Sequence, residues 1–217
     1  MKLASITFHF RPKGESMARY TGPTHKLCRA EGIALCGLSK CPVIRKNAAL
    51  PGQHGQRGRR KPSEYGIQLR EKQKVKRIYG VLERQFARYF DLASRKKAAT
   101  GEALLQILES RLDNVIYRLN FAETRPQARQ LVSHGHVFVG DQKVTIPSYN
   151  VKIHDVITLS QKASNLGFVK KLTEDKNRKL PDWLEKKATV GRVKSIPKRE
   201  DLETDINERL IVEYYSR

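Results

Sequence analysis

One short stretch of the chain carries four side chains that could bind a metal ion. His25 and Cys28 form one closely spaced pair and Cys36 and Cys41 a second, so each pair can wrap around one ion. Zinc prefers four nitrogen and sulfur ligands in a tetrahedron, and this set supplies one imidazole and three thiols. The spacing predicts a structural Zn²⁺, with His54 as a reserve ligand. An arm of roughly 40 residues with Gly and Pro buries too little surface to fold without such a tie.

A second group consists of four arginines on two predicted helices. Arg111 and Arg118 are two turns apart on the first helix, and Arg125 and Arg129 are one turn apart on the second, so each pair projects from one helix face. The second pair has no carboxylate one turn further on. A planar guanidinium suits phosphate and stacks on bases, which favours a nucleic-acid contact. The alternative is an ordinary solvated charged face.

The most basic part of the chain lies between residues 57 and 97, with 14 Lys and Arg against 4 Asp and Glu. Its run KQKVKR, residues 72–77, is either a phosphate-binding segment or a solubilising one. Residues 81–96 predict an amphipathic helix, with Arg84 and Arg88 opposite its apolar side. These cations are candidate phosphate contacts.

Composition points to a polyanionic partner. The net charge is +21 and the pI is about 10.1, far more than solubility requires. No apolar run approaches the roughly 20 residues that span a membrane, and the start lacks the apolar core of a signal peptide. Three cysteines, an odd number, favour a reducing cytoplasm over a disulfide scaffold.

Catalytic motifs are absent from the sequence. It contains no G-x-S-x-G, no Walker loop and no dinucleotide fingerprint, so neither an enzyme activity nor a small-molecule substrate is expected. His134 and His136 flank Gly135, but His134 is better explained as a cation at a helix C-terminus that could also touch phosphate.

Residues 110–159 show the clearest local structure. Leu112, Val115, Ile116 and Leu119 form one apolar helical stripe, and Thr124 with Gln127 forms a capping box for a second helix that ends at Gly135. HVFV, the turn Gly140-Asp141 and KVTI predict a β-hairpin, followed by a strand in VITLS. Elsewhere we predict helices at 102–109 and 168–179, a packing anchor at Trp183 and Leu184, and a strand-prone tail at 210–215.

The segment SRLDNVIYRLNFAETRPQARQLVSHGHVFV resembles the small RNA-binding module named after ribosomal small-subunit protein four. The flanks MARYTGP, PGQHG, YGIQLREKQKVKRIYGVLERQF and DINERLIVEYYSR resemble the rest of that protein family, so that the resemblance runs from Met17 to Arg217. One departure is the hairpin turn, Val139-Gly140-Asp141 where the family usually has Val-Asn-Gly; both versions tolerate positive φ.

The resemblance implies an α+β fold with a helical N-terminal region and a module of two helices on a small antiparallel sheet, the αL motif. It implies a structural protein of the small ribosomal subunit that binds the 5′ domain of 16S rRNA, nucleates 30S assembly and contributes to translational accuracy. Implied partners are small-subunit proteins five and three and mRNA near its entry channel, in the cytoplasm and away from membranes. Two alternatives are an RNA-acting enzyme or chaperone that borrows the module, and a zinc-dependent DNA-binding regulator.

Fourteen residues are predicted to bind RNA on this basis. They are Lys72, Lys74, Lys76, Arg77, Arg84, Arg88, Arg111, Arg118, Arg125, Gln127, Arg129, Gln130, His134 and Lys143.

The resemblance also bears on the metal. Zinc-bearing members of the family use four cysteines, as a C-x-x-C pair and a C-x₄-C pair, and His25 stands where the first cysteine would be. Many members lack the metal, so the alternative is a decayed site with an exposed His25.

The chain divides into five expected parts. Residues 1–16 precede the usual family start at Met17 and are expected to be a mis-annotated extension, the alternative being a basic arm that threads into RNA. An arm with the zinc site (17–56), a basic helical region (57–109), the RNA-binding module (110–160) and a C-terminal segment packed on the body (161–217) follow.

Overall fold

The structure is a computed structural model that describes residues 20–45, 49–57, 61–175, 179–201 and 206–217. Residues 1–16 and their two interpretations lie outside this range. The described α-helices are α1 (Thr24–Glu31), α2 (Glu64–Ile78), α3 (Glu83–Ser94), α4 (Thr100–Glu109), α5 (Leu112–Arg118), α6 (Arg125–Ser133), α7 (Gln161–Ser164), α8 (Gly167–Glu174) and α9 (Glu208–Tyr215). The strands are β1 (Val137–Val139), β2 (Gln142–Lys143), β3 (Val156–Leu159), β4 (Leu184–Lys187) and β5 (Val190–Val193), and 3₁₀ turns lie at Gly55–Arg57 and Arg199–Asp201.

Helices α5 and α6 form as their local sequence predicts. All four residues of the apolar stripe on and after α5 are fully buried. The Thr124 side chain accepts a hydrogen bond from the Gln127 backbone N–H, and Gln127 Oε1 in turn accepts from the Glu123 N–H at 2.8 Å. These reciprocal bonds satisfy helix-terminal donors. Gly135 follows the helix at φ 69°, the left-handed conformation expected of a glycine that ends a helix.

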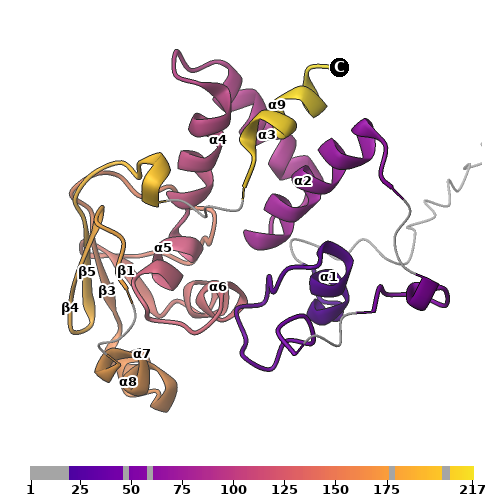
Figure 1. Ribbon diagram of the computed structural model, residues 1–217. Coiled ribbons are helices and arrows are strands. Elements are labelled where there is room, and N and C mark those ends of the chain that lie inside the picture. Colours follow the sequence, from indigo (N-terminus) through magenta and orange to yellow (C-terminus); the bar gives the residue numbers. More distant parts are fainter. Residues whose placement is uncertain (1–19, 46–48, 58–60, 176–178, 202–205) are drawn as a thin grey trace, which may run out of the picture.

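One antiparallel sheet of order β2-β1-β3-β5-β4 packs beside these helices (Figure 1). The predicted hairpin is confirmed as β1 and β2, with Gly140 at φ 58° in the turn, although β2 is only two residues long. Ile157 and Leu159 face the helices, and Trp183 and Leu184 are buried in the same core, which confirms them as a packing anchor. The α+β fold class is thereby confirmed.

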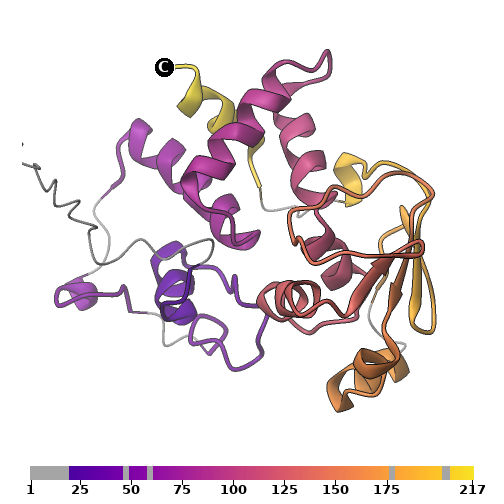
Figure 2. The ribbon, with the colours of Figure 1, turned by 180° about the vertical axis from the view of Figure 1, so that it is seen from behind.

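A second apolar core holds α2, α3, α4 and α9 together, on the other side of α5 and α6 from the sheet (Figures 1 and 2). Phe86, Tyr89 and Ala93 line it from α3. Helix α9 contributes Ile211, which is fully buried, so that the C-terminal end of the chain completes a core begun more than 100 residues earlier. Among the described residues, no side chain belongs to both cores.

Two sequence-based predictions of secondary structure are wrong. The tail at 210–215 is helical, not extended, because Ile211 and Tyr215 lie one turn apart and both pack on the helical core, Tyr215 against Phe90, and this tertiary packing outweighs the strand propensity of isolated residues. The helix predicted at 168–179 ends at Glu174, well before Pro181. No described helix is both long and apolar enough to cross a membrane.

Candidate nucleic-acid interface and metal site

The four predicted metal ligands come together in the structure. The ligand atoms of His25, Cys28, Cys36 and Cys41 all lie within 4.8 Å of one another, and Cys36 Sγ is 3.8 Å from His25 Nδ1. Ligands of a tetrahedral Zn²⁺ with sulfur at about 2.3 Å are about 3.8 Å apart, so the donor set fits such an ion with small shifts. All three cysteines are free thiols, and burial raises the pKa of Cys28 to about 12. His54, the reserve ligand, is exposed and lies outside the cluster.

The arm that carries these ligands is fastened to the helical region by ion pairs. Gly32, the residue after α1, has the left-handed conformation at φ 76° and turns the chain toward Cys36. Glu31, the last residue of α1, pairs with Arg77 and, at 3.5 Å, with Arg70 of α2. One of the predicted RNA contacts, Arg77, therefore already has a carboxylate partner within the chain.

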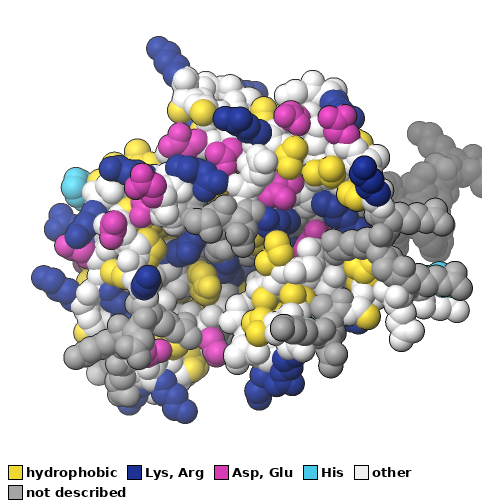
Figure 3. All heavy atoms as spheres, viewed as in Figure 1, with side chains coloured by type: hydrophobic (Ala, Val, Ile, Leu, Met, Phe, Trp, Pro, Cys, Tyr) yellow, Lys and Arg dark blue, Asp and Glu magenta, His cyan; other side chains and the backbone are white. Residues whose placement is uncertain are grey.

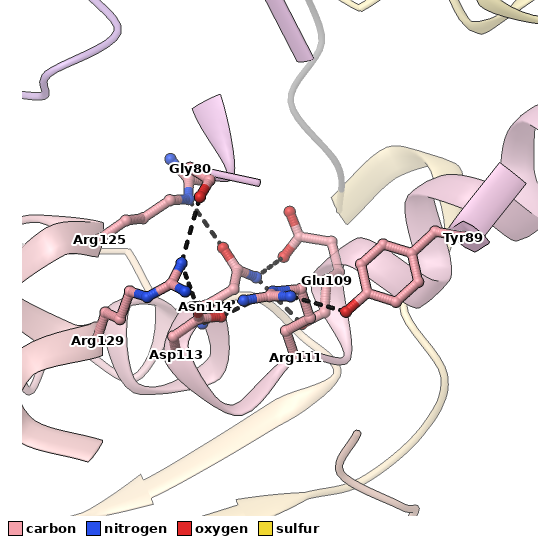
Figure 4. Close-up of polar contacts among 8 residues, drawn as sticks. All are labelled: Gly80, Tyr89, Glu109, Arg111, Asp113, Asn114, Arg125 and Arg129. Carbon is pink, nitrogen blue, oxygen red and sulfur yellow. Dashed lines mark hydrogen bonds and ion pairs between the residues drawn. The ribbon is translucent and has the colours of Figure 1, made fainter. Parts of the chain in front are cut away.

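Arg111 is placed differently from the prediction. Its side chain is 2% exposed, donates two hydrogen bonds to the Asp113 carboxylate at 3.0 and 2.5 Å, and donates a third to Tyr89 Oη at 2.7 Å (Figure 4). The bonds to Asp113 and Tyr89 raise its pKa against the effect of burial. In the structure this guanidinium is held by protein partners and presents little surface to a phosphate, so Arg111 is not among the contacts proposed below.

Lys72 and Lys74 of α2 are buried in the same way. Lys72 is 4% exposed, donates to Glu83 Oε1 at 2.8 Å and lies 4.3 Å from the centre of the Tyr214 ring. Lys74 is 8% exposed and pairs with Glu71 at 3.3 Å. Helix α9 packs on α2, and the two lysines are paired with the neighbouring carboxylates of Glu83 and Glu71. Lys76 is half-buried and shares Glu83 with Lys72.

The remaining arginines of the module lie over a buried carboxylate. Arg118 binds Glu109 through two bonds of 3.0 and 2.7 Å, and Arg125 donates from Nε to Asn114 Oδ1 at 2.9 Å. Arg129 donates to the Gly80 carbonyl at 3.2 Å and keeps a fifth or so of its side-chain surface exposed. Each of these three arginines is therefore held by a hydrogen-bond partner within the protein, and Figure 4 shows Arg125 and Arg129 side by side near Asn114 and Gly80.

Five other predicted contacts are solvent-exposed. They are Arg84 and Arg88 on α3, Gln130 at the outer face of α6, His134 at its C-terminal end and Lys143 at the end of β2. On the face drawn in Figure 3, Lys and Arg side chains are spread over the whole surface with carboxylates interspersed. On this face the positive charge is therefore spread out and does not form one compact patch.

Sequence reasoning missed two residues of this site. Glu109 and Asn114 are buried polar residues beneath the arginines. The sequence offered one signal for them: both are polar residues close to the apolar stripe of α5, where buried side chains are expected. Their partners, Tyr79 and Arg125, are too distant in sequence for spacing to reveal them.

A basic protein with two cores, a two-helix module and an arginine-lined surface belongs to the class of nucleic-acid-binding proteins. Comparison with known proteins narrows the class. Residues 19–109 match the family model "Ribosomal protein S4/S9 N-terminal domain", and residues 110–157 match the "S4 domain".

The chain is similar to small ribosomal subunit protein uS4A of Symbiobacterium thermophilum, with 52% identity over 93% of the chain and 100% of the relative. It is similar, at 55% identity and the same coverage, to uS4 of Thermoanaerobacter sp. strain X514, and at 53% identity to uS4 of Dictyoglomus thermophilum. The chain belongs to the uS4 family of small ribosomal subunit proteins. This confirms the resemblance seen in the sequence and the prediction that the chain is a ribosomal protein and not an enzyme.

Proposed function

We propose that this protein is a structural constituent of the small ribosomal subunit, located on the cytoplasmic ribosome, and that it binds 16S rRNA through the exposed cations of both halves. Family membership supports the ribosomal role. The single observation that supports RNA binding best is the net charge of +21, with Lys and Arg side chains spread over the face drawn in Figure 3. Such a surface suits a folded RNA whose helices are contacted along their backbones.

The proposed contacts are the predicted side chains that the structure leaves wholly or partly accessible. They are Lys76, Arg77, Arg84, Arg88, Arg118, Arg125, Gln127, Arg129, Gln130, His134 and Lys143. The deep, narrow major groove of A-form RNA excludes side chains, so these groups bind phosphates and riboses and recognise shape. At finer detail, we propose the 5′ domain of 16S rRNA as the target, a role in nucleating assembly and in accuracy, and contacts with small-subunit proteins five and three and with mRNA near its entry channel.

Loss of two exposed arginines should reduce both affinity and its dependence on salt. The double variant Arg84→Ala/Arg88→Ala removes two cations without disturbing a core, because neither side chain is buried. We expect the slope of log K against log salt for a 16S rRNA 5′-domain fragment to fall by about two, since each phosphate contact contributes about one.

The matched control is Lys170→Ala, which removes an exposed cation from α8. It should leave the slope nearly unchanged. Wild-type binding that does not change between about 50 and 200 mM salt would contradict electrostatic recognition of RNA.

We also propose that His25, Cys28, Cys36 and Cys41 hold one structural Zn²⁺. The convergence of four nitrogen and sulfur donors supports it, because thiolates and imidazole are the ligands of structural zinc sites. The ion would contribute folding energy to the arm, and the four donors leave no place for a reactive water.

Protein purified without chelator should contain about one equivalent of zinc by elemental analysis. His25→Ala should lower that content, because one of four ligands is lost, whereas His54→Ala should not, because His54 is outside the cluster. Less than about a tenth of an equivalent in the wild type would refute the site. Full zinc content in His25→Ala would keep the metal but refute this fourth ligand.

A further inference from the structure

The boundary between the two apolar cores is polar and buried. Helix α4 of the helical core is followed directly in the chain by α5 of the module core. The residues at this junction include Glu109, Arg111, Asp113 and Asn114, each 5% exposed or less. We call the cluster formed by Tyr79, Glu109, Asn114, Arg118 and Arg125 the polar joint. An apolar boundary would tolerate sliding, whereas directional hydrogen bonds fix one arrangement.

Glu109 is the centre of the polar joint. Its fully buried carboxylate accepts from Tyr79 Oη at 2.7 Å, from Asn114 Nδ2 at 2.6 Å and twice from Arg118. Burial opposes ionisation, but the charge and hydrogen bonds of Arg118 outweigh it and hold the pKa of Glu109 below its usual value. Glu109 is therefore an anion at neutral pH, with four donors directed at its two oxygens.

Asn114 links the buried Glu109 to Arg125 nearer the surface. Its Nδ2 donates to Glu109 while its Oδ1 accepts from Arg125 Nε, so that one side chain connects the buried anion with an outer arginine (Figure 4). The Arg125 guanidinium also lies 5.1 Å from the ring of Tyr79 and 4.5 Å from the ring of Tyr117. Tyr79 comes from the end of α2 and Tyr117 from α5, so the side-chain conformation of Arg125 depends on both halves of the molecule.

We infer that Glu109 is a positioning residue for RNA binding, which acts through Arg118 and Arg125 and through the fixed orientation of the two halves. This inference rests on the proposed function, since it assumes that the arginines contact RNA. Stability alone does not explain why this position holds a buried ion pair, because such a pair contributes little net stability compared with apolar side chains of the same size. What the polar joint supplies is a single geometry in which the arginines of α5 and α6 and the arginines of α3 can meet one folded RNA together.

Glu109→Gln separates positioning from simple charge because the two predict effects of opposite sign. The substitution keeps the shape of the side chain and raises the net charge by one, so charge alone predicts tighter RNA binding. Positioning predicts that affinity for a 16S rRNA 5′-domain fragment falls at least about tenfold, because phosphate contacts that fix register are lost. Affinity for single-stranded polyuridylate, which has no fixed shape, should stay equal or increase.

A second variant keeps the charge constant. Asn114→Ala breaks the connection to Arg125 while the Glu109–Arg118 pair remains, so it should weaken binding of the 5′-domain fragment in the same direction. In a double-mutant cycle, Arg125→Ala should cost little more in the Asn114→Ala background than Asn114→Ala costs alone. Thermal melting followed by circular dichroism verifies that each variant is folded. If Glu109→Gln fails to fold, the double-mutant cycle of Asn114→Ala and Arg125→Ala tests the inference in its place.

The outcomes separate this inference from the proposed function. Positioning is overturned if folded Glu109→Gln binds the 5′-domain fragment as tightly as the wild type or more tightly, or if the effects of Asn114→Ala and Arg125→Ala simply add. The proposed function fails instead if the wild-type protein binds the fragment without dependence on salt. A selective loss on the folded RNA, together with non-additive effects in the cycle, supports both.

Discussion

Chelation of zinc should unfold the arm from Thr24 to Arg45 while the module keeps its structure. Apart from the ion pairs of Glu31, the arm has little else to hold it: α1 is eight residues long, begins without a side-chain cap and buries only Cys28. Helices of this length are marginal in water. The apparent binding energy of structural zinc in small domains is roughly 10–16 kcal/mol at neutral pH, and most of it becomes folding energy of the segment that supplies the ligands.

Amide hydrogen exchange read by mass spectrometry measures this effect. With a chelator present, peptides from residues 24–45 should exchange at the rate of an unfolded chain, whereas peptides from α5 and α6 should keep their protection. His54→Ala is the matched control, because it removes an exposed histidine near the arm and should leave protection intact. Persistent protection of α1 in protein shown to be free of zinc would mean that Glu31 and its arginine partners hold the arm without a metal.

Local patterns in the sequence predicted local structure well. The apolar stripe of α5, the Thr124 cap, the left-handed Gly135 and the Gly140-Asp141 turn are all present in the structure. Each depends on residues a few positions apart, so the sequence contains the whole interaction. Each pair of the His25, Cys28, Cys36 and Cys41 cluster was predictable for the same reason. That the two pairs lie together follows from the fold.

Contacts between distant residues were not predictable in this way. Arg111 reads as a surface cation, but its partner Tyr89 is 22 residues earlier, and the burial of Lys72 depends on a helix at the far end of the chain. A basic run in the sequence shows how many cations a segment has. It does not show which of them are paired with carboxylates within the folded protein. Glu109 was overlooked because its role comes from four donor groups on three residues, Asn114 and Arg118 of α5 and Tyr79 just after α2.

Helix α9 is the clearest case of structure set by distant partners. Its residues have strand propensity, yet Tyr215 stacks on Phe90 with ring centres 4.5 Å apart, and its hydroxyl donates to Glu83 at 3.0 Å. A Cβ added to Gly101 of α4 would come within 2.7 Å of the Glu208 side chain, which shows how closely α4 and α9 approach. The helical core is therefore incomplete until the last residues of the chain are in place.

Ile211→Ala should destabilise the helical core by about 2–5 kcal/mol, the usual cost of removing a buried isoleucine side chain and leaving a cavity. Ile211 is fully buried against α2, α3 and α4. Arg209→Ala on the same helix is the control, because Arg209 is exposed and its loss should change stability by less than about 0.5 kcal/mol.

Two optical signals can show which of the two cores loses stability in Ile211→Ala. Trp183 is the single tryptophan and lies in the core of the module, so its fluorescence reports on that core, while circular dichroism reports mainly on the helices. In urea, Ile211→Ala should lower the midpoint of the dichroism transition and leave the fluorescence midpoint in place. Equal shifts of both midpoints would contradict separate unfolding of the two cores. They would mean that the polar joint around Glu109 couples them into one cooperative unit.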